Sequence, residues 1–152
     1  MDKASGQGIE LVARPVKTIV ACWITAVLIL GVCVLAATAM GGKTEGGGAF
    51  HSADAYAMVG LGLLTGLGVL AFARPRVWAD ATTVRVRNVF NTVELPWQVV
   101  KAVRFTRGAS WAMLELADDD VVAVMAIQAV DKGRAVAAVN RLRRLHAESR
   151  GE

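Results

Sequence analysis

The sequence has too few cysteines, histidines and aromatic residues for several common classes of protein. Its 152 residues include 2 Cys and 2 His, which excludes a disulfide framework, a four-cysteine metal site and most histidine metal centres built within one chain. Only 4 Trp, 4 Phe and 1 Tyr accompany a hydrophobic fraction of 55% and a mean hydropathy of +0.45. The apolar excess is therefore Ala, Val, Leu and Gly, which is typical of membrane helices rather than of a wholly soluble enzyme.

Two long uncharged stretches predict membrane-spanning helices. Residues 18–40 and residues 55–73 contain no charged side chain, and at about 1.5 Å per residue each can cross a hydrocarbon core of about 30 Å. The glycine-rich residues 41–54 between them predict an exposed outer loop. A cleaved signal peptide ending near 37–39 is the alternative for the first stretch, but its apolar region is longer than the usual 7 to 15 or so residues. We expect a transmembrane hairpin over 18–73.

The distribution of Lys and Arg predicts the orientation of this hairpin. Three such residues precede the first stretch and four follow within about 15 residues of the second (Arg74, Arg76, Arg85 and Arg87), whereas the loop contains only Lys43. Positive residues are retained on the cytoplasmic side. The sequence therefore predicts a multi-pass protein of the cell membrane, with a cytoplasmic N-terminal tail (1–17) and a cytoplasmic C-terminal domain (74–152).

Small residues in the second stretch predict close helix packing. Gly62 and Gly66 form a small-xxx-small pair, which lets another helix approach because no side chain intervenes. Packing against the first span is the favoured interpretation, and contact with a helix of another membrane protein is the alternative. Cys22 and Cys33 lie on one helical face but about 16 Å apart along the axis, so they cannot bond to each other.

The composition changes after Pro75, which ends the second helix. From there apolar and polar residues alternate with a period of two, as in 84–87 and 103–105, and this pattern predicts short antiparallel strands. Asp118–Asp120 form a polar turn between two further strands. Asp131 is expected to cap a terminal amphipathic helix. The expected fold class is α+β, with about six strands in a small open barrel and one C-terminal helix.

This order of elements resembles the pleckstrin-homology (PH) superfold, and particular motifs carry the likeness. They are Val77-Trp78-Ala79-Asp80, Val84 to Asn88, Leu95-Pro96-Trp97 and Ala126-Ile127-Gln128. The run from 74 to 147 is similar to the small actinobacterial membrane-anchored PH-domain family that includes the mycobacterial low-molecular-weight protein antigen 6. One departure is the triple Asp turn, where the family leads us to expect an Asp-Gly pair. The resemblance implies no catalytic residues.

Residues for known chemistry are absent or separated. His51 lies in the predicted outer loop and His146 in the cytoplasmic helix. On neither side of the membrane do we therefore expect a nucleophile to lie beside a histidine that acts as its general base. No phosphate-binding glycine motif occurs in a suitable context. The triple Asp turn could ligate a divalent cation, but it lacks EF-hand spacing and is more simply a solvated hairpin turn. We expect no enzyme activity, no cofactor or metal, no nucleic acid and no small-molecule substrate.

Four arginines are the candidate ligand-binding residues. On strands of period two, Arg85, Arg87 and Arg104 point away from the apolar face. The face that they share is either a solvated surface or a surface for anionic lipid, where each Lys or Arg contributes about 1 kcal/mol. The four are Arg85, Arg87, Arg104 and Arg107. Trp97 and Trp111 could line a groove, but Trp97 beside Pro96 is better interpreted as core.

The favoured function is therefore a non-enzymatic interaction module. It would serve as an adaptor or accessory subunit of a membrane protein complex, with a membrane protein as its partner. The alternative is an anionic-lipid-binding domain at the cytoplasmic membrane face.

Overall fold

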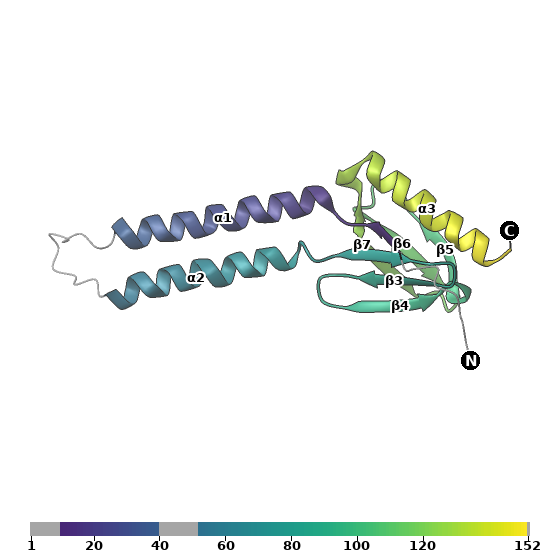
Figure 1. Cartoon of the computed structure of the whole chain (residues 1–152), viewed down its shortest axis with the longest axis horizontal. Coiled ribbons are helices and arrows are strands. Elements are labelled where there is room, and N and C mark those ends of the chain that lie inside the picture. The colour runs from purple at the N-terminus through teal and green to yellow at the C-terminus, as the bar shows by residue number, and fades with distance from the viewer. Residues whose placement is uncertain (1–9, 40–51, 152) are drawn as a thin grey trace. The chain divides into compact units, whose positions relative to one another are not determined.

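The computed structural model describes residues 10–39 and 52–151. Most of the predicted outer loop, with Lys43 and His51, and the tail residue Lys3 lie outside the described residues. The chain divides into two compact units, one formed by 18–73 and the other by the residues before and after it. Figure 1 shows the order of the elements along the chain.

The first unit is a pair of helices. Helix α1 spans Val16–Ala39 and α2 spans Ser52–Ala71, each within about three residues of the predicted bounds. Both are long and apolar enough to cross a membrane, and large apolar side chains such as Leu28 and Leu64 are mostly exposed along them. The hydroxyls of Thr38 and Thr65 donate to carbonyls one turn earlier in their own helices, so they add no unsatisfied donor to this apolar surface.

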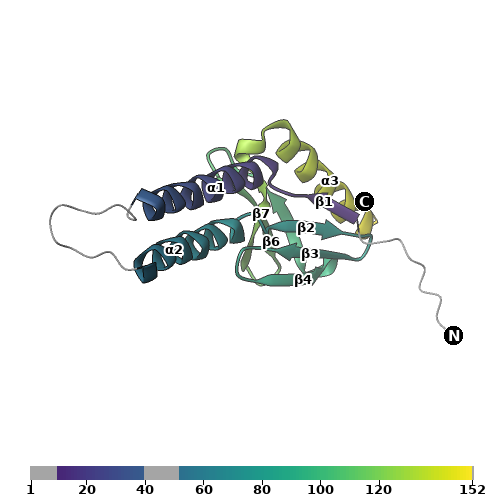
Figure 2. The same cartoon turned by 60° about the vertical axis from the view of Figure 1, so that its left-hand side comes forward.

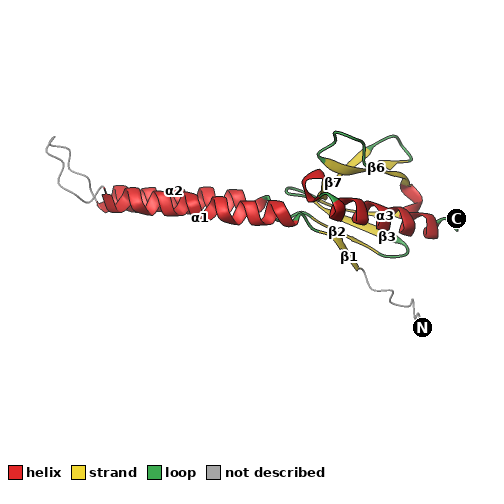
Figure 3. Cartoon of the chain, turned by 90° about the horizontal axis from the view of Figure 1, so that it is seen from above, coloured by secondary structure: helices red, strands yellow, loops and turns green. Residues whose placement is uncertain are grey.

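The two helices lie side by side in Figure 1 and Figure 2 and overlap when they are seen from above in Figure 3. They come close together at two glycines of α2. A Cβ atom added to Gly62 would lie 2.7 Å from the Cβ of Cys33, and one added to Gly66 would lie 3.7 Å from the carbonyl oxygen of Ala26. The absence of a side chain at Gly62 is therefore required by α1 of the same hairpin.

The second unit is an antiparallel β domain with a terminal helix. One sheet has the order β1-β2-β3-β4 and the other the order β5-β6-β7, as seen in Figure 2 for the first sheet. The strands are β1 (Glu10–Ala13), β2 (Arg76–Ala79), β3 (Thr83–Arg87), β4 (Thr92–Pro96), β5 (Val100–Arg104), β6 (Trp111–Leu116) and β7 (Val121–Gln128), followed by α3 (Gly133–Ser149). The predicted α+β class, with two apolar helices, antiparallel strands and a C-terminal helix, is confirmed.

The first strand differs from the expectation of a simple N-terminal tail. β1 pairs with β2, so that Glu10 faces Ala79 and Leu11 faces Trp78, and Val12 packs against the core. The residues Glu10-Leu11-Val12-Ala13 do not alternate between apolar and polar, and their partner strand lies more than 60 residues away. The helical hairpin is thus an insertion between the first two strands of one sheet.

The core lies between the two sheets and α3. Strand residues such as Val77, Val84 and Leu114 are fully buried, and Ala135, Val139 and Leu142 of α3 join the same cluster. Along β3 the buried side chains of Val84 and Val86 alternate with more exposed ones, as a half-buried strand requires.

Trp97 is fully buried, which confirms the prediction that it is a core residue. It lies in the short 3₁₀ helix η1 (Trp97–Val99), which joins the two sheets. Its indole N–H donates to the carbonyl oxygen of Asp80 at 2.8 Å, and its ring centroid lies 5.7 Å from that of His146 on α3. Trp111, by contrast, is 38% exposed.

Polar side chains close the ends and edges of the sheets. The buried Asn88 follows β3, and its amide donates to the carbonyl of Ala123 while its oxygen accepts from the N–H of Met125, so it bridges to β7. On the edge strand β5, the carbonyl of Val103 accepts from Arg143 and that of Val100 contacts His146 at 2.7 Å. α3 thereby covers an edge that would otherwise be open.

Candidate functional site

The β domain has two ends that differ in charge. We call the end where the chain leaves β1 for α1 and returns from α2 into β2 the junction end, and the opposite end the far end. At the junction end Ala13 pairs with Val77, and Arg76 pairs with Arg87. The turn between β3 and β4 follows directly after Arg87, so it belongs to the junction end.

Two contacts bring further segments to the junction end. The N–H of Lys17 donates to the buried carboxylate of Asp131 at 3.2 Å, which places the start of α3 there. The N–H of Ala129 donates to the carbonyl of Ser110 at 2.9 Å, which adds the loop between β5 and β6.

Eight basic residues gather at this end as a result, and we call them the basic end. They are Arg14, Lys17, Arg74, Arg76, Arg87, Arg107, Lys132 and Arg134. In the part of the chain that the structure describes, none of the eight forms an ion pair, because the five ion pairs all use other cations. Asp131 is the one acid described at this end, and it is buried. The end therefore presents uncompensated positive charge.

The four arginines predicted from the sequence are divided by the structure. Arg85 on β3 pairs with Glu94 of β4 at 2.7 Å, and Arg104 on β5 pairs with Glu115 of β6 at 2.6 Å. They extend from the outer faces of two different sheets. Arg87 and Arg107 belong to the basic end. Half of the predicted set therefore has carboxylate partners within its own sheet.

Sequence reasoning missed most of the basic end for identifiable reasons. Arg14, Lys17, Arg74 and Arg76 lie within a few residues of the apolar stretches, and this proximity was a usable signal. Lys132 and Arg134 join them only because Asp131 bonds to Lys17, a contact between residues 114 positions apart. That contact has no signature in the sequence.

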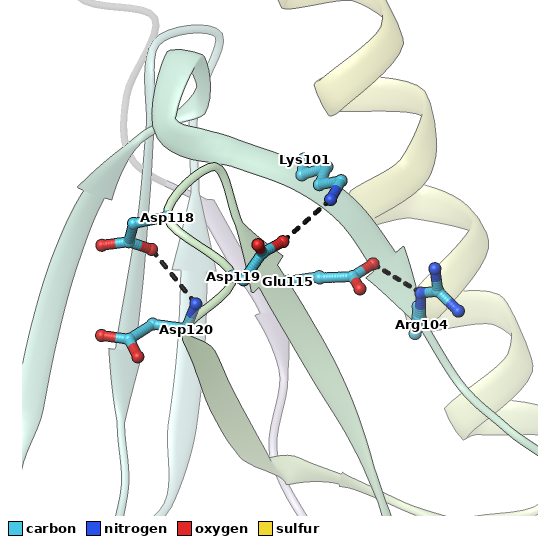
Figure 4. Close-up of polar contacts among 6 residues, drawn as sticks. All are labelled: Lys101, Arg104, Glu115, Asp118, Asp119 and Asp120. Atoms are coloured by element: carbon cyan, nitrogen blue, oxygen red, sulfur yellow. Dashed lines mark hydrogen bonds and ion pairs between the residues drawn. The ribbon is translucent and has the colours of Figure 1, made fainter.

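The far end carries the acidic turn between β6 and β7, shown in Figure 4. Asp118 Oδ1 accepts from the N–H of Asp120 at 3.2 Å, and Asp119 pairs with Lys101 at 3.0 Å. This bond to Asp119 is the main reason that the pKa of Lys101 is raised. Asp119 has φ of 66°, so it occupies the left-handed position that the expected Asp-Gly pair would give to glycine. No cluster of three metal-ligating side chains occurs in the described ranges.

Asp80 organises the turn between β2 and β3 at the far end. Its carboxylate accepts from the N–H groups of Thr82 and Thr83 at 2.7 and 2.6 Å and from both of their hydroxyls. Burial alone would raise the pKa of this carboxyl, but the four hydrogen bonds outweigh burial and lower its pKa. Because the Asp80 carbonyl also holds Trp97, the turn and the core depend on each other.

A pocket of about 380 Å³ opens beside the basic end. Its lining combines apolar residues of β1, β7 and α3, such as Val12, Ile127 and Ala138, with the polar groups of Arg14 and Arg134. Arg141 also lines it and pairs with Glu10. An apolar floor with guanidinium groups suits a molecule that has both an apolar part and an anionic part.

Comparisons with known proteins agree with this architecture. Residues 74–145 match a family described as the bacterial PH domain. Three curated mycobacterial relatives, the uncharacterized proteins Mb1452 of Mycobacterium bovis and MT1460 and Rv1417 of Mycobacterium tuberculosis, are each 46% identical over 101 residues. The aligned region covers 66% of this chain and 66% of each relative, just under two thirds of their length. No solved structure gives a significant match.

Proposed function

Because residues 74–145 match the bacterial PH domain family, we propose that the chain is a non-enzymatic, membrane-anchored PH-like interaction module. It acts as an adaptor or accessory subunit of a membrane protein complex. The observation that carries this proposal is the insertion of two apolar helices between β1 and β2. An insertion at that place attaches the domain to the membrane through two neighbouring strands of one sheet.

The charge distribution supports a cytoplasmic location for the domain. Four cations of the basic end, Arg14, Lys17, Arg74 and Arg76, lie where the chain enters and leaves the apolar helices, and residues that flank a span in this way remain on the cytoplasmic side. Both termini are then cytoplasmic. The same proposal places the chain in the small actinobacterial PH-domain family that includes low-molecular-weight protein antigen 6.

The His, Cys and Asp side chains that could take part in catalysis lie in structural positions, which supports a binding rather than a catalytic function. His146 packs on Trp97 and contacts a backbone carbonyl of β5. Cys22 and Cys33 are free thiols within α1. Asp131 accepts the N–H of Lys17. These arrangements stabilise the fold and position no nucleophile beside a base.

Co-purification from gently solubilised membranes tests the adaptor function. The full chain, carrying an affinity tag, is expected to retain a specific membrane protein that mass spectrometry identifies. A matched control retains the helical hairpin (residues 14–76) without the rest of the domain. Loss of the partner from the control assigns binding to the domain, and retention assigns it to the helices. Recovery of lipid alone from the full chain contradicts the adaptor proposal.

The basic end favours anionic-lipid binding as a second candidate function. Cations near an anionic leaflet each contribute about 1 kcal/mol. Within the described residues those of the basic end form no ion pair, and two of them, Arg14 and Arg134, line a pocket with an apolar floor. The residues that support this candidate are Arg14 and Arg134 together with Arg87 and Arg107. The ion-paired Arg85 and Arg104 support it less.

Vesicle binding separates the two candidates. The probe is a linker-closed domain, in which a short Gly-Ser segment replaces residues 18–73 so that β1 remains joined to β2. Arg14→Gln with Arg134→Gln is expected to weaken binding to phosphatidylglycerol vesicles, whereas the matched Arg85→Gln with Arg104→Gln changes it little. Weak binding that disappears near 0.5 M salt, where the Debye length is about 4 Å, agrees with an adaptor. Tight binding of one lipid at matched vesicle charge favours the lipid candidate instead.

A further inference from the structure

Phe90 is the most exposed large apolar side chain recorded in the described residues. Its exposed fraction is 91%, although an aromatic ring in water is unfavourable and normally finds cover. It lies in the turn between β3 and β4. The fold itself does not explain an aromatic residue at this position, since no core residue covers it.

The turn that carries Phe90 is held firmly. The N–H of Asn88 donates to the carbonyl of Asn91 at 2.8 Å and closes the turn. The side chain of Asn88 bonds to two backbone groups of β7. Phe90 is therefore presented at a defined place and not on a loose loop.

That place is set by the strand register. Arg87, three residues before Phe90, faces Arg76 of β2. Arg76 follows the last residue of α2 by only five positions, a reach of at most about 18 Å even for a fully extended chain. The Phe90 turn thus lies at the junction end of the domain, where the chain continues from α2 into β2.

The positive charges near the turn indicate that it faces a negatively charged surface. Among the residues that the structure describes, none forms an ion pair with Arg74, Arg76 or Arg87, which lie on the same end. The acidic turn at 118–120 lies on the far end. Exposed aromatic residues beside cations are the pattern by which protein surfaces enter the headgroup layer of an anionic bilayer. A protein partner of opposite charge is the competing occupant.

We propose that the Phe90 turn inserts into the headgroup layer of the membrane that α1 and α2 cross, with Arg74, Arg76 and Arg87 against lipid phosphates. The domain is then held with its basic end on the bilayer and its acidic turn facing away. This inference rests on the proposed membrane anchoring. It adds a second attachment point, which restricts the rotation of the domain about its two connections to the helices.

Spin-label accessibility on the full chain tests the insertion. Cys22 and Cys33 are replaced by Ala, and a single cysteine is placed at Asn91, beside the aromatic ring, and labelled with a nitroxide. The chain is reconstituted in vesicles of phosphatidylglycerol and phosphatidylcholine. The label is expected to be reached better by membrane-soluble oxygen than by a water-soluble nickel complex. Adding Phe90→Ser is expected to reverse this preference without altering the fold, because Phe90 packs against nothing in the core.

Two further label positions serve as controls. A label at Ala81, in the exposed turn of the far end, is expected to prefer the nickel complex. A label at Leu28, in the middle of α1, is expected to prefer oxygen whether or not Phe90 is present. If the label at Asn91 behaves like the one at Ala81 while the label at Leu28 prefers oxygen, the proposed insertion of the turn is wrong and the proposed membrane anchoring is retained. If Leu28 itself prefers the nickel complex, the membrane anchoring is wrong and the inserted turn falls with it.

Discussion

Trp97 links three parts of the domain through one side chain. It lies in the segment that joins the sheets, its N–H bonds to the end of β2, and its ring packs on His146 of α3. Replacing such a buried aromatic leaves a cavity and an unpaired carbonyl. Its contribution is therefore both apolar and polar.

We expect Trp97→Ala to lower the free energy of unfolding of the linker-closed domain by about 3 to 5 kcal/mol. Urea denaturation followed by circular dichroism measures this change. Trp111→Ala is the matched control, because its side chain is 38% exposed, and its effect should be much smaller. An unchanged stability for Trp97→Ala with loss of partner binding would instead assign Trp97 to a surface site.

The Asp80 carboxylate predicts a dependence of stability on acid pH. Its hydrogen bonds lower its pKa in the folded state, below the ordinary value of about 3.9. The stabilisation is thus complete above that ordinary value and is lost as the pH falls toward the folded-state pKa. We expect Asp80→Asn to lower the free energy of unfolding more at pH 7 than at pH 3.

Urea midpoints of the linker-closed domain at the two pH values measure this difference. Asp120→Asn, in the exposed acidic turn, is the matched control for removing one carboxylate. An equal loss for Asp80→Asn at both pH values contradicts the role assigned to the charged form.

Strand β1 makes the domain dependent on residues that precede the first helix. Without β1, the edge of β2 is open and the core loses the cover of Val12. We expect residues 74–152 alone to be less stable than the linker-closed domain by at least about 2 kcal/mol, the scale of burying one valine side chain. Thermal unfolding of the two chains measures this. Equal melting temperatures would show that β1 is dispensable.

The packing of α1 on α2 depends on Gly62. The Cβ of an alanine there would meet Cys33 at 2.7 Å, so we expect Gly62→Ala to lower the thermal stability of the full chain in detergent. Gly68→Ala is the matched control, since a Cβ at Gly68 meets nothing within 4 Å. Adding Cys33→Gly to Gly62→Ala should restore stability. Failure of this rescue would place the important contact of Gly62 outside the hairpin.

The orientation of the whole chain follows from its charge asymmetry. In intact cells we expect an impermeant thiol reagent to label a cysteine placed at Ser52 but not one placed at Ser149, with Cys22 and Cys33 replaced by Ala. Disruption of the cells should expose Ser149→Cys to the reagent and serves as the control. Labelling of Ser149→Cys from outside would overturn the cytoplasmic location of the domain.

The sequence alone was sufficient wherever structure depends on neighbouring residues. Uncharged runs gave the two helices to within about three residues, because helix length and hydropathy are local properties. The alternation of Val and Arg gave β3, and Pro96-Trp97 gave a core position. The likeness to the PH superfold rested on the order of these elements and on short motifs such as Leu95-Pro96-Trp97.

Contacts between distant residues decided the rest. β1 is recognisable only through its pairing with β2, because its residues Glu10–Ala13 do not alternate between apolar and polar. Pairing with Glu94 and Glu115 separated Arg85 and Arg104 from Arg87 and Arg107, and the bond between Lys17 and Asp131 brought α3 to the basic end. The net charge of a surface depends on which residues face each other, and that information exists only once the strands have paired and the helix has docked.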